Sequence, residues 1–197
     1  MMIRSFISIN LPDEIKKRLS EIISDLKKHD ADIKWVSPDS IHLTLKFLGN
    51  IEASIAATII EKLQKKIASY EPFYIKIAGV GCFPSEKRPR VIWVGIEGPD
   101  TIRRLQTDIE TEMSGLGFEP EDRPFSPHLT IGRVRSMRGM AGVMNRFRDF
   151  SNADLGSMEV SGIHLMKSDL KPSGAIYSVL GDIQFNKGRT DVKQGKA

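Results

Sequence analysis

The chain has 197 residues, of which 40% are hydrophobic and 27% are charged. This is enough to bury a core, and no apolar run approaches the roughly 20 residues that a membrane-spanning helix needs. The net charge of +4 gathers near the end of the chain, so it does not by itself indicate nucleic-acid binding, and a single cysteine, Cys82, excludes an internal disulfide.

Alternating polar and apolar residues predict strands, and apolar residues at helical spacing predict amphipathic helices. The expected elements, in chain order, are strand 4–10, helix 12–28, strand 41–48, helix 54–69, strand 73–80, strand 91–96, helix 101–116, strand 128–134, helix 140–150, strand 160–166 and a closing strand 175–186. The glycine and asparagine at positions 49 and 50 are expected to end the second strand.

The order of these elements repeats. His42 lies 39 residues after Ile3, and His128 lies 37 residues after Val91, each counted from a strand start. We therefore predict one bilobal domain, residues 1–187, with duplicated halves at roughly 1–82 and 90–168, followed by a disordered basic tail at 188–197. The expected fold class is α+β, with two pseudo-symmetric lobes that each contain an antiparallel sheet and flanking helices and that enclose a central cleft.

Two short segments share one pattern, a histidine followed by an apolar residue, a threonine and a second apolar residue. They read His42-Leu-Thr44-Leu and His128-Leu-Thr130-Ile. Because side chains alternate along a strand, the histidine and threonine of each segment should project from one side while the apolar residues enter the core. The sequence thus predicts two imidazoles and two hydroxyls that face a common cleft.

Hydrolysis of a phosphodiester needs such a pair, because water loses a proton as the departing sugar oxygen gains one. Histidine serves either role near neutral pH, and threonine hydroxyls can donate to the non-bridging oxygens. The residues alone leave open which histidine is the acid. Arg133 is a further candidate for binding the phosphate, although its odd spacing from His128 requires a bend near Gly132; the alternative is a surface arginine.

The ordered segments RSFISINLP, IHLTLKFLGN, RPRVIWVGI and FSPHLTIGRV resemble the 2H phosphoesterase superfamily, in particular the RNA 2′,3′-cyclic phosphodiesterases, historically called 2′-5′ RNA ligases. This resemblance implies metal-free hydrolysis of RNA 2′,3′-cyclic phosphate ends to 2′-phosphates, without a cofactor. By similarity, His42 is the proton donor and His128 the proton acceptor. The expected partner is RNA with a cyclic phosphate terminus, with tRNA fragments among the candidates, and the protein is expected to be cytoplasmic and monomeric.

Two alternatives remain: joining of RNA ends through a 2′-5′ bond in the same cleft, and non-catalytic binding of RNA ends. Two other histidines, His29 and His164, are expected to be structural, and Cys82 is expected to be a small buried apolar residue. Phe47 has the spacing of a core residue. The aromatic residues that remain as unranked candidates for stacking on a nucleobase are Trp35, Phe83, Phe125 and Tyr177.

Overall fold

The computed structural model describes residues 1–171 and 174–186. Its helices are α1 (Asp13–Lys27), α2 (Ala56–Ile67), α3 (Thr101–Ser114) and α4 (Met140–Phe150). Its strands are β1 (Met2–Asn10), β2 (Ile33–Trp35), β3 (His42–Glu52), β4 (Phe73–Phe83), β5 (Val91–Glu97), β6 (His128–Val134), β7 (Asp154–Val160), β8 (Gly162–Lys171) and β9 (Gly174–Gln184). The four predicted helices are therefore confirmed, and the predicted tail at 188–197 lies outside the described residues.

The strand predictions were wrong at three places. The short strand β2 was not expected, and β3 continues beyond Gly49, whose φ of 69° is accommodated within the strand instead of ending it. The single strand predicted at 160–166 is two strands, interrupted at Ser161. The interruption has a topological reason, because β7 pairs with β4 whereas β8 pairs with β1 in the other half of the sheet.

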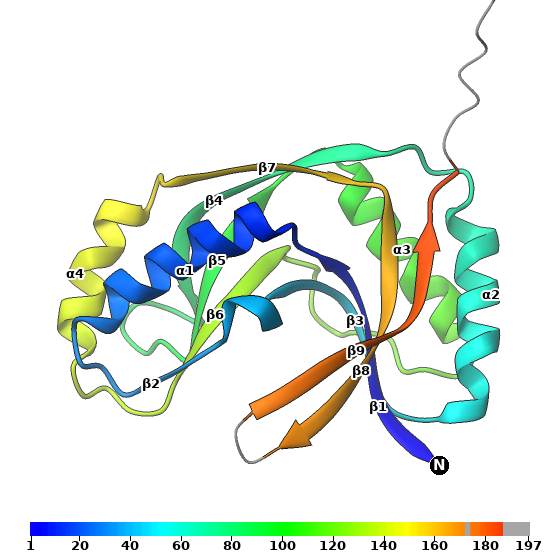
Figure 1. Ribbon diagram of the computed structural model, residues 1–197, viewed down its shortest axis with the longest axis horizontal. Coiled ribbons are helices and arrows are strands. Elements are labelled where there is room, and N and C mark those ends of the chain that lie inside the picture. Colours follow the sequence, from blue (N-terminus) through cyan, green and yellow to red (C-terminus); the bar gives the residue numbers. More distant parts are fainter. Residues whose placement is uncertain (172–173, 187–197) are drawn as a thin grey trace, which may run out of the picture.

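The strands form one nine-stranded sheet in the order β7-β4-β5-β6-β3-β1-β8-β9, with β2 paired to β6. Every pairing is antiparallel. The sheet has two four-stranded halves, β9-β8-β1-β3 and β6-β5-β4-β7, which meet where β3 lies beside β6. Figure 1 shows this meeting point near the middle of the molecule.

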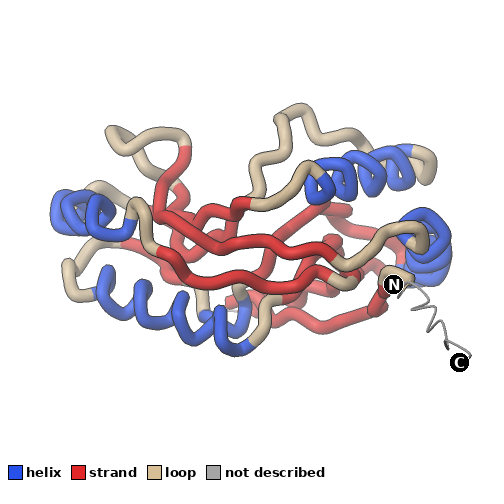
Figure 2. The backbone as a smooth tube through the Cα atoms, turned by 90° about the horizontal axis from the view of Figure 1, so that it is seen from above, coloured by secondary structure: helices blue, strands red, loops and turns tan. Residues whose placement is uncertain are grey.

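The helices divide between the two halves of the sheet. α1 contacts β7 and α4 contacts β4, whereas α2 contacts β9 and α3 contacts β3. Figure 1 shows α1 and α4 toward one end of the molecule and α2 and α3 at the other, and Figure 2 shows strands running through the middle between them. The expected α+β architecture with two lobes is confirmed.

The buried surface of the sheet faces the helices. The apolar stripes of α1 and α3, including Leu19, Leu26, Leu105 and Ile109, belong to one continuous apolar core with the inward residues of the strands. None of the helices in the described parts of the chain is long and apolar enough to span a membrane. This helix-covered side is called the helix face below, and the opposite side is called the motif face because both histidine motifs lie on it.

Candidate active site

The two histidine motifs meet at the centre of the sheet. The paired residues of β3 and β6 are Leu43 and Leu129. In an antiparallel ladder this register sets His42 opposite Thr130 and Thr44 opposite His128, all on the motif face, with both leucines buried on the helix face. The histidines are then diagonal neighbours, and such positions lie about 7–8 Å apart.

Each imidazole is oriented by the same backbone contact. Nδ1 of His42 lies 2.9 Å from the carbonyl oxygen of Ser40, and Nδ1 of His128 lies 2.7 Å from that of Ser126. A carbonyl only accepts, so each Nδ1 carries the proton and donates. Each Nε2 is therefore left to accept a proton when the ring is neutral and to donate one when the ring is charged.

Aromatic rings enclose His42. The Phe6 ring stacks on the imidazole with centroids 4.6 Å apart, and the Tyr177 ring meets it edge-on at 5.1 Å. Burial among these groups lowers the pKa of His42 below its usual value, and the bond to the Ser40 carbonyl offsets part of this shift. In the free protein at neutral pH, His42 is therefore mainly in its neutral form.

His128 borders a pocket on the motif face. The Phe83 ring meets its imidazole edge-on at 5.1 Å, and Trp93 packs against Phe83 with centroids 5.2 Å apart. The pocket has a volume of about 250 Å³, and Gly95, Glu97 and Arg103 also line it. Among the stacking candidates, Tyr177 and Phe83 thus lie beside the histidines.

The remaining two candidates, Trp35 and Phe125, pack against the apolar core. Trp35 stands on the helix face, where its ring lies close to Gly132. Trp93 was not among the residues predicted to lie at the site. It lies two positions from Gly95, which pairs with His128, but only the pairing of β5 with β6 reveals that proximity.

Matching irregularities follow the two motifs. Leu45 and Lys46 are buried consecutively in β3, as are Ile131 and Gly132 in β6, and the pairing register shifts at both places. Such a bulge inserts one residue and reverses the side-chain alternation beyond it.

Arg133 and Phe47 are the first residues after these bulges. Arg133 pairs with Val91, on the same side of β5 as Trp93, so it stands on the motif face despite its odd spacing. Phe47 pairs with Phe6 and is 58% exposed, and the two rings lie 6.2 Å apart. The interpretation of Phe47 as a core residue was therefore wrong, because it assumed that side chains keep alternating between the two faces of the strand through the bulge.

Lys46 was not among the predicted site residues either. It is only 5% exposed, and its Nζ lies 2.6 Å from a carboxylate oxygen of Glu110 on α3. The same Nζ donates to the carbonyl of Glu119 at 3.0 Å. Lys46 thus links the first motif strand to the segment that leads into the second motif, which Arg103 also holds by donating to the Phe125 carbonyl at 2.8 Å.

The other singled-out residues lie away from the junction of β3 and β6. His29 packs beside Gly142 on α4, and Cys82 is partly buried against the core, where burial raises the pKa of its thiol. His164 pairs with Ser8 on the motif face, and its Nε2 lies 3.6 Å from a carboxylate oxygen of Asp182. Within residues 1–171 and 174–186, no three His, Cys, Asp or Glu side chains converge as a metal-binding group.

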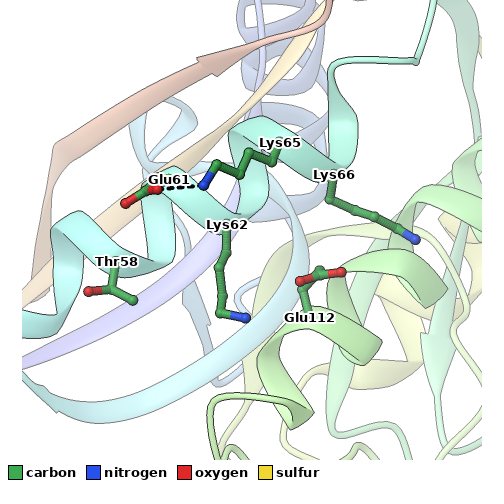
Figure 3. A pocket seen from close by; sticks show the side chains of 6 residues that line it. All are labelled: Thr58, Glu61, Lys62, Lys65, Lys66 and Glu112. Carbon is green, nitrogen blue, oxygen red and sulfur yellow. Dashed lines mark hydrogen bonds and ion pairs between the residues drawn. The ribbon is translucent and has the colours of Figure 1, made fainter.

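A larger depression, of about 450 Å³, lies away from the motifs and is shown in Figure 3. It lies between α2 and α3, and its lysines are largely compensated: Lys65 pairs with Glu61 at 2.6 Å and Lys66 with Asp108 at 3.1 Å. None of the residues lining it belongs to a strand of the sheet.

The model of a family described as LigT like Phosphoesterase matches two consecutive stretches, residues 9–93 and 94–177. The chain is 37% identical to the RNA 2′,3′-cyclic phosphodiesterase of Methanothermobacter thermautotrophicus over 90% of this chain and 96% of that protein. It is 35% identical to the protein of the same name from Thermotoga maritima, over 94% and 97% of the two chains.

Solved structures share the fold. The protein TT0787 of Thermus thermophilus superposes with a TM-score of 0.79 and 26% identity, over 94% of this chain and all of that one. Escherichia coli LigT complexed with 3′-AMP gives a TM-score of 0.74 and 25% identity, over 95% of this chain and all of that one. Together with the family match over most of the chain, these similarities establish that the protein belongs to the LigT-like family of 2H phosphoesterases.

Proposed function

We propose that this protein hydrolyses RNA 2′,3′-cyclic phosphate ends to 2′-phosphates without a metal, with His42 as proton donor and His128 as proton acceptor. The supporting observation is the register of β3 on β6, which sets two imidazoles and two threonines together on one face. The substrate class follows the names of the relatives.

The reaction needs one proton to leave and one to arrive on opposite sides of phosphorus. Nε2 of His128 removes a proton from water as its oxygen bonds to phosphorus, and the bond from phosphorus to the 3′ oxygen breaks. That oxygen takes a proton from Nε2 of His42. Each Nδ1 stays bound to its serine carbonyl, which keeps the reactive nitrogen directed at the phosphate.

The hydroxyls of Thr44 and Thr130 donate to the non-bridging oxygens, where negative charge grows in the transition state. The guanidinium of Arg133, carried to the motif face by the bulge, supplies a charge-assisted hydrogen bond to the same anion.

A proton donor must be protonated, and the lowered pKa of His42 disfavours that form in the free protein, so bound substrate has to restore it. A phosphodiester carries a negative charge, and an anion close to the imidazole favours its protonated form, opposing the effect of burial. His42 therefore becomes charged as the substrate binds, and neutral as it gives its proton to the leaving oxygen.

The test is product analysis with an RNA oligonucleotide ending in a 2′,3′-cyclic phosphate, in the presence of EDTA. We expect the 2′-phosphate as the product, and a loss of kcat of about 10²–10⁴-fold in each of His42→Ala and His128→Ala. His164→Ala is the matched control, since His164 lies two strands away from β3 and should leave the rate nearly unchanged.

Four results would overturn the proposal. A 3′-phosphate product would show that the bond from phosphorus to the 2′ oxygen breaks, and not the bond to the 3′ oxygen. Activity that EDTA abolishes and a divalent ion restores would reject the metal-free route. Joined RNA in excess of hydrolysed RNA would make end joining the principal reaction, whereas saturable RNA binding without turnover would support a non-catalytic binder.

A further inference from the structure

Three cationic side chains stand together at one end of the motif face. Arg133 on β6 pairs with Lys34 on β2, and Arg135 follows Arg133 by two positions. The backbone N–H of Arg135 donates to the carbonyl of Asp32 at 2.9 Å, which continues the pairing of the two strands by one step. Because paired residues, and residues two apart in a strand, share a face, all three side chains project from the motif face. The group of Lys34, Arg133 and Arg135 is called the basic end below.

The cations of the basic end lack carboxylate partners within the part of the chain that the structure describes. All three residues are exposed, and none of the ion pairs between described residues includes Lys34, Arg133 or Arg135. The carboxylate of Asp32, opposite Arg135, instead accepts a hydrogen bond from Ser136 at 2.7 Å. Like charges directly opposite each other on neighbouring strands are destabilising, so Lys34 and Arg133 repel each other in the free protein. An anion bound between them would remove this repulsion.

The basic end begins close to the second motif and extends away from it. On β5, Trp93 pairs with Thr130 and Val91 pairs with Arg133. Two residues of a strand span about 7 Å, so Arg133 lies roughly that far from Thr130 along the sheet. Lys34 lies one strand spacing, about 5 Å, to the side of Arg133. In the proposed reaction Arg133 binds the phosphate at the motifs, and the other two cations of the basic end stand beyond it.

The other half of the site has an apolar residue at the equivalent position. Phe47 corresponds to Arg133, since each is the first residue after the bulge in its motif strand. At Phe47 the strand β3 pairs only with β1, so no residue of the described sheet corresponds to Lys34. Arg4, which pairs with Asn50, is an exposed cation on the motif face at this opposite end. Positive charge is thus concentrated on one side of the two motifs.

The chemistry of the substrate determines where its remaining negative charge lies. In a nucleotide that ends in a 2′,3′-cyclic phosphate, the 2′ and 3′ oxygens are both bound to one phosphorus, so the chain continues only through the 5′ oxygen. Every further phosphate therefore lies on one side of the terminal ribose. Lysine and arginine side chains are the usual ligands of nucleic-acid phosphates, and they bind them without regard to the base.

We infer that the RNA chain upstream of the terminal nucleotide leaves the site over the basic end, where Lys34 and Arg135 bind its phosphates. The preferred substrate is accordingly an oligonucleotide and not a mononucleotide. This inference rests on the proposed function for the reaction that the substrate undergoes.

The first test compares two substrates at one salt concentration, adenosine 2′,3′-cyclic phosphate and a trinucleotide with the same end. We expect a higher kcat/KM for the trinucleotide. Lys34→Gln and Arg135→Gln should each lower kcat/KM for the trinucleotide by about 2- to 5-fold, the size of an exposed ion pair, and should lower it less for the mononucleotide. Lys34→Arg keeps the charge and should restore the rate. Arg4→Gln, at the opposite end, is the matched control and should change neither rate.

The second test measures equilibrium binding of the trinucleotide product, which ends in a 2′-phosphate, at several salt concentrations. Each phosphate contact on a single strand contributes about 0.7 to the slope of log K against log salt concentration. The double variant Lys34→Gln with Arg135→Gln should therefore reduce the slope by about 1.4. A trinucleotide with uncharged methylphosphonate links should bind the wild type and the double variant equally. Urea unfolding checks the fold, and Lys34→Gln should not lower stability, because it removes a repulsion.

The outcomes separate the inference from the proposed function. Equal kcat/KM for the two substrates, or equal losses for both in Lys34→Gln, would refute the path over the basic end while leaving the enzyme assignment intact. A loss confined to Arg4→Gln would place the chain at the opposite end and would also refute the inference. Salt-dependent binding through Lys34 and Arg135 in a protein that hydrolyses neither substrate would support the path and reject the proposed reaction.

Discussion

Leu43 and Leu129 lie directly opposite each other at the junction of β3 and β6, and both are almost completely buried. Each is flanked in sequence by the histidine and threonine of its own motif. The packing of these two side chains on the helix face therefore fixes the separation of the two histidine–threonine pairs on the motif face.

Removing one of these leucines should damage both stability and activity. Leu43→Ala should lower the free energy of unfolding by about 2–5 kcal/mol, because it leaves a cavity in the core. Urea denaturation measures this effect, and kcat at a temperature where the variant is folded should fall because the motif strands shift. Leu170→Ala, at a position that is 67% exposed, is the control and should change stability by less than about 0.5 kcal/mol. Equal effects of both substitutions would contradict the role given to the junction.

Opening the aromatic enclosure of His42 should raise its pKa. Burial is the main cause of the low pKa, so Tyr177→Ala, which admits water to the imidazole, should return the pKa toward the ordinary value of about 6.5. The shift is measured by NMR titration of the His42 ring protons in the free protein. Tyr74→Ala, at an exposed tyrosine, should leave that titration unchanged. A pKa that falls or stays constant in Tyr177→Ala would show that burial is not the cause.

The pKa of His42 should also determine how kcat/KM depends on pH when His128 is removed. In His128→Ala the residual kcat/KM should fall as the pH rises through the pKa of His42, because only the protonated imidazole donates. Since that pKa is lowered, the fall should occur at a lower pH than for an ordinary histidine. Tyr177→Ala in the same background should move the fall to higher pH. A fall that moves in the opposite direction would reject His42 as the proton donor.

Arg133 should contribute to substrate binding through its charge. Arg133→Ala should lower kcat/KM by about 10- to 150-fold, the loss expected for a charge-assisted hydrogen bond of about 1.5–3 kcal/mol. The loss should shrink at high salt, because counterions screen the exposed guanidinium. Arg148→Ala, an exposed arginine on α4, is the matched control and should have little effect. Identical rates for wild type and Arg133→Ala would place Arg133 outside the site.

The buried Lys46 should support both motifs. Lys46→Ala should cost about 3–5 kcal/mol of stability, because Glu110 is left without its partner and the Glu119 carbonyl loses its donor. Lys46→Met with Glu110→Gln should recover a substantial part of this loss, since it removes both charges. Thermal and urea unfolding provide the measurements. Lys65→Ala, which removes an exposed pair with Glu61, should cost less than about 1 kcal/mol. If the double variant were no more stable than Lys46→Ala, the unpaired charge would not be the cause.

The sequence predicted the bounds of the helices more accurately than the bounds of the strands. The apolar stripe of α4, including Val143 and Phe147, repeats at helical spacing, so local pattern fixed its bounds at Met140–Phe150. The strand after it was misjudged, because the break at Ser161 arises from β7 and β8 pairing with strands in different halves of the sheet. Such long-range pairing leaves no local periodicity.

The sequence by itself determined the family of this protein and the candidates for its site: two histidines and two threonines in matching strand motifs, and a resemblance to a family that the comparisons confirm. Only the tertiary structure decided which side chains join them. The bulges after the motifs bring Phe47 and Arg133 to the motif face, and the pairing of β5 with β6 brings Trp93 beside Thr130. Alternation within a strand is a local property of the backbone, whereas bulges and register depend on packing between strands that are distant in the sequence.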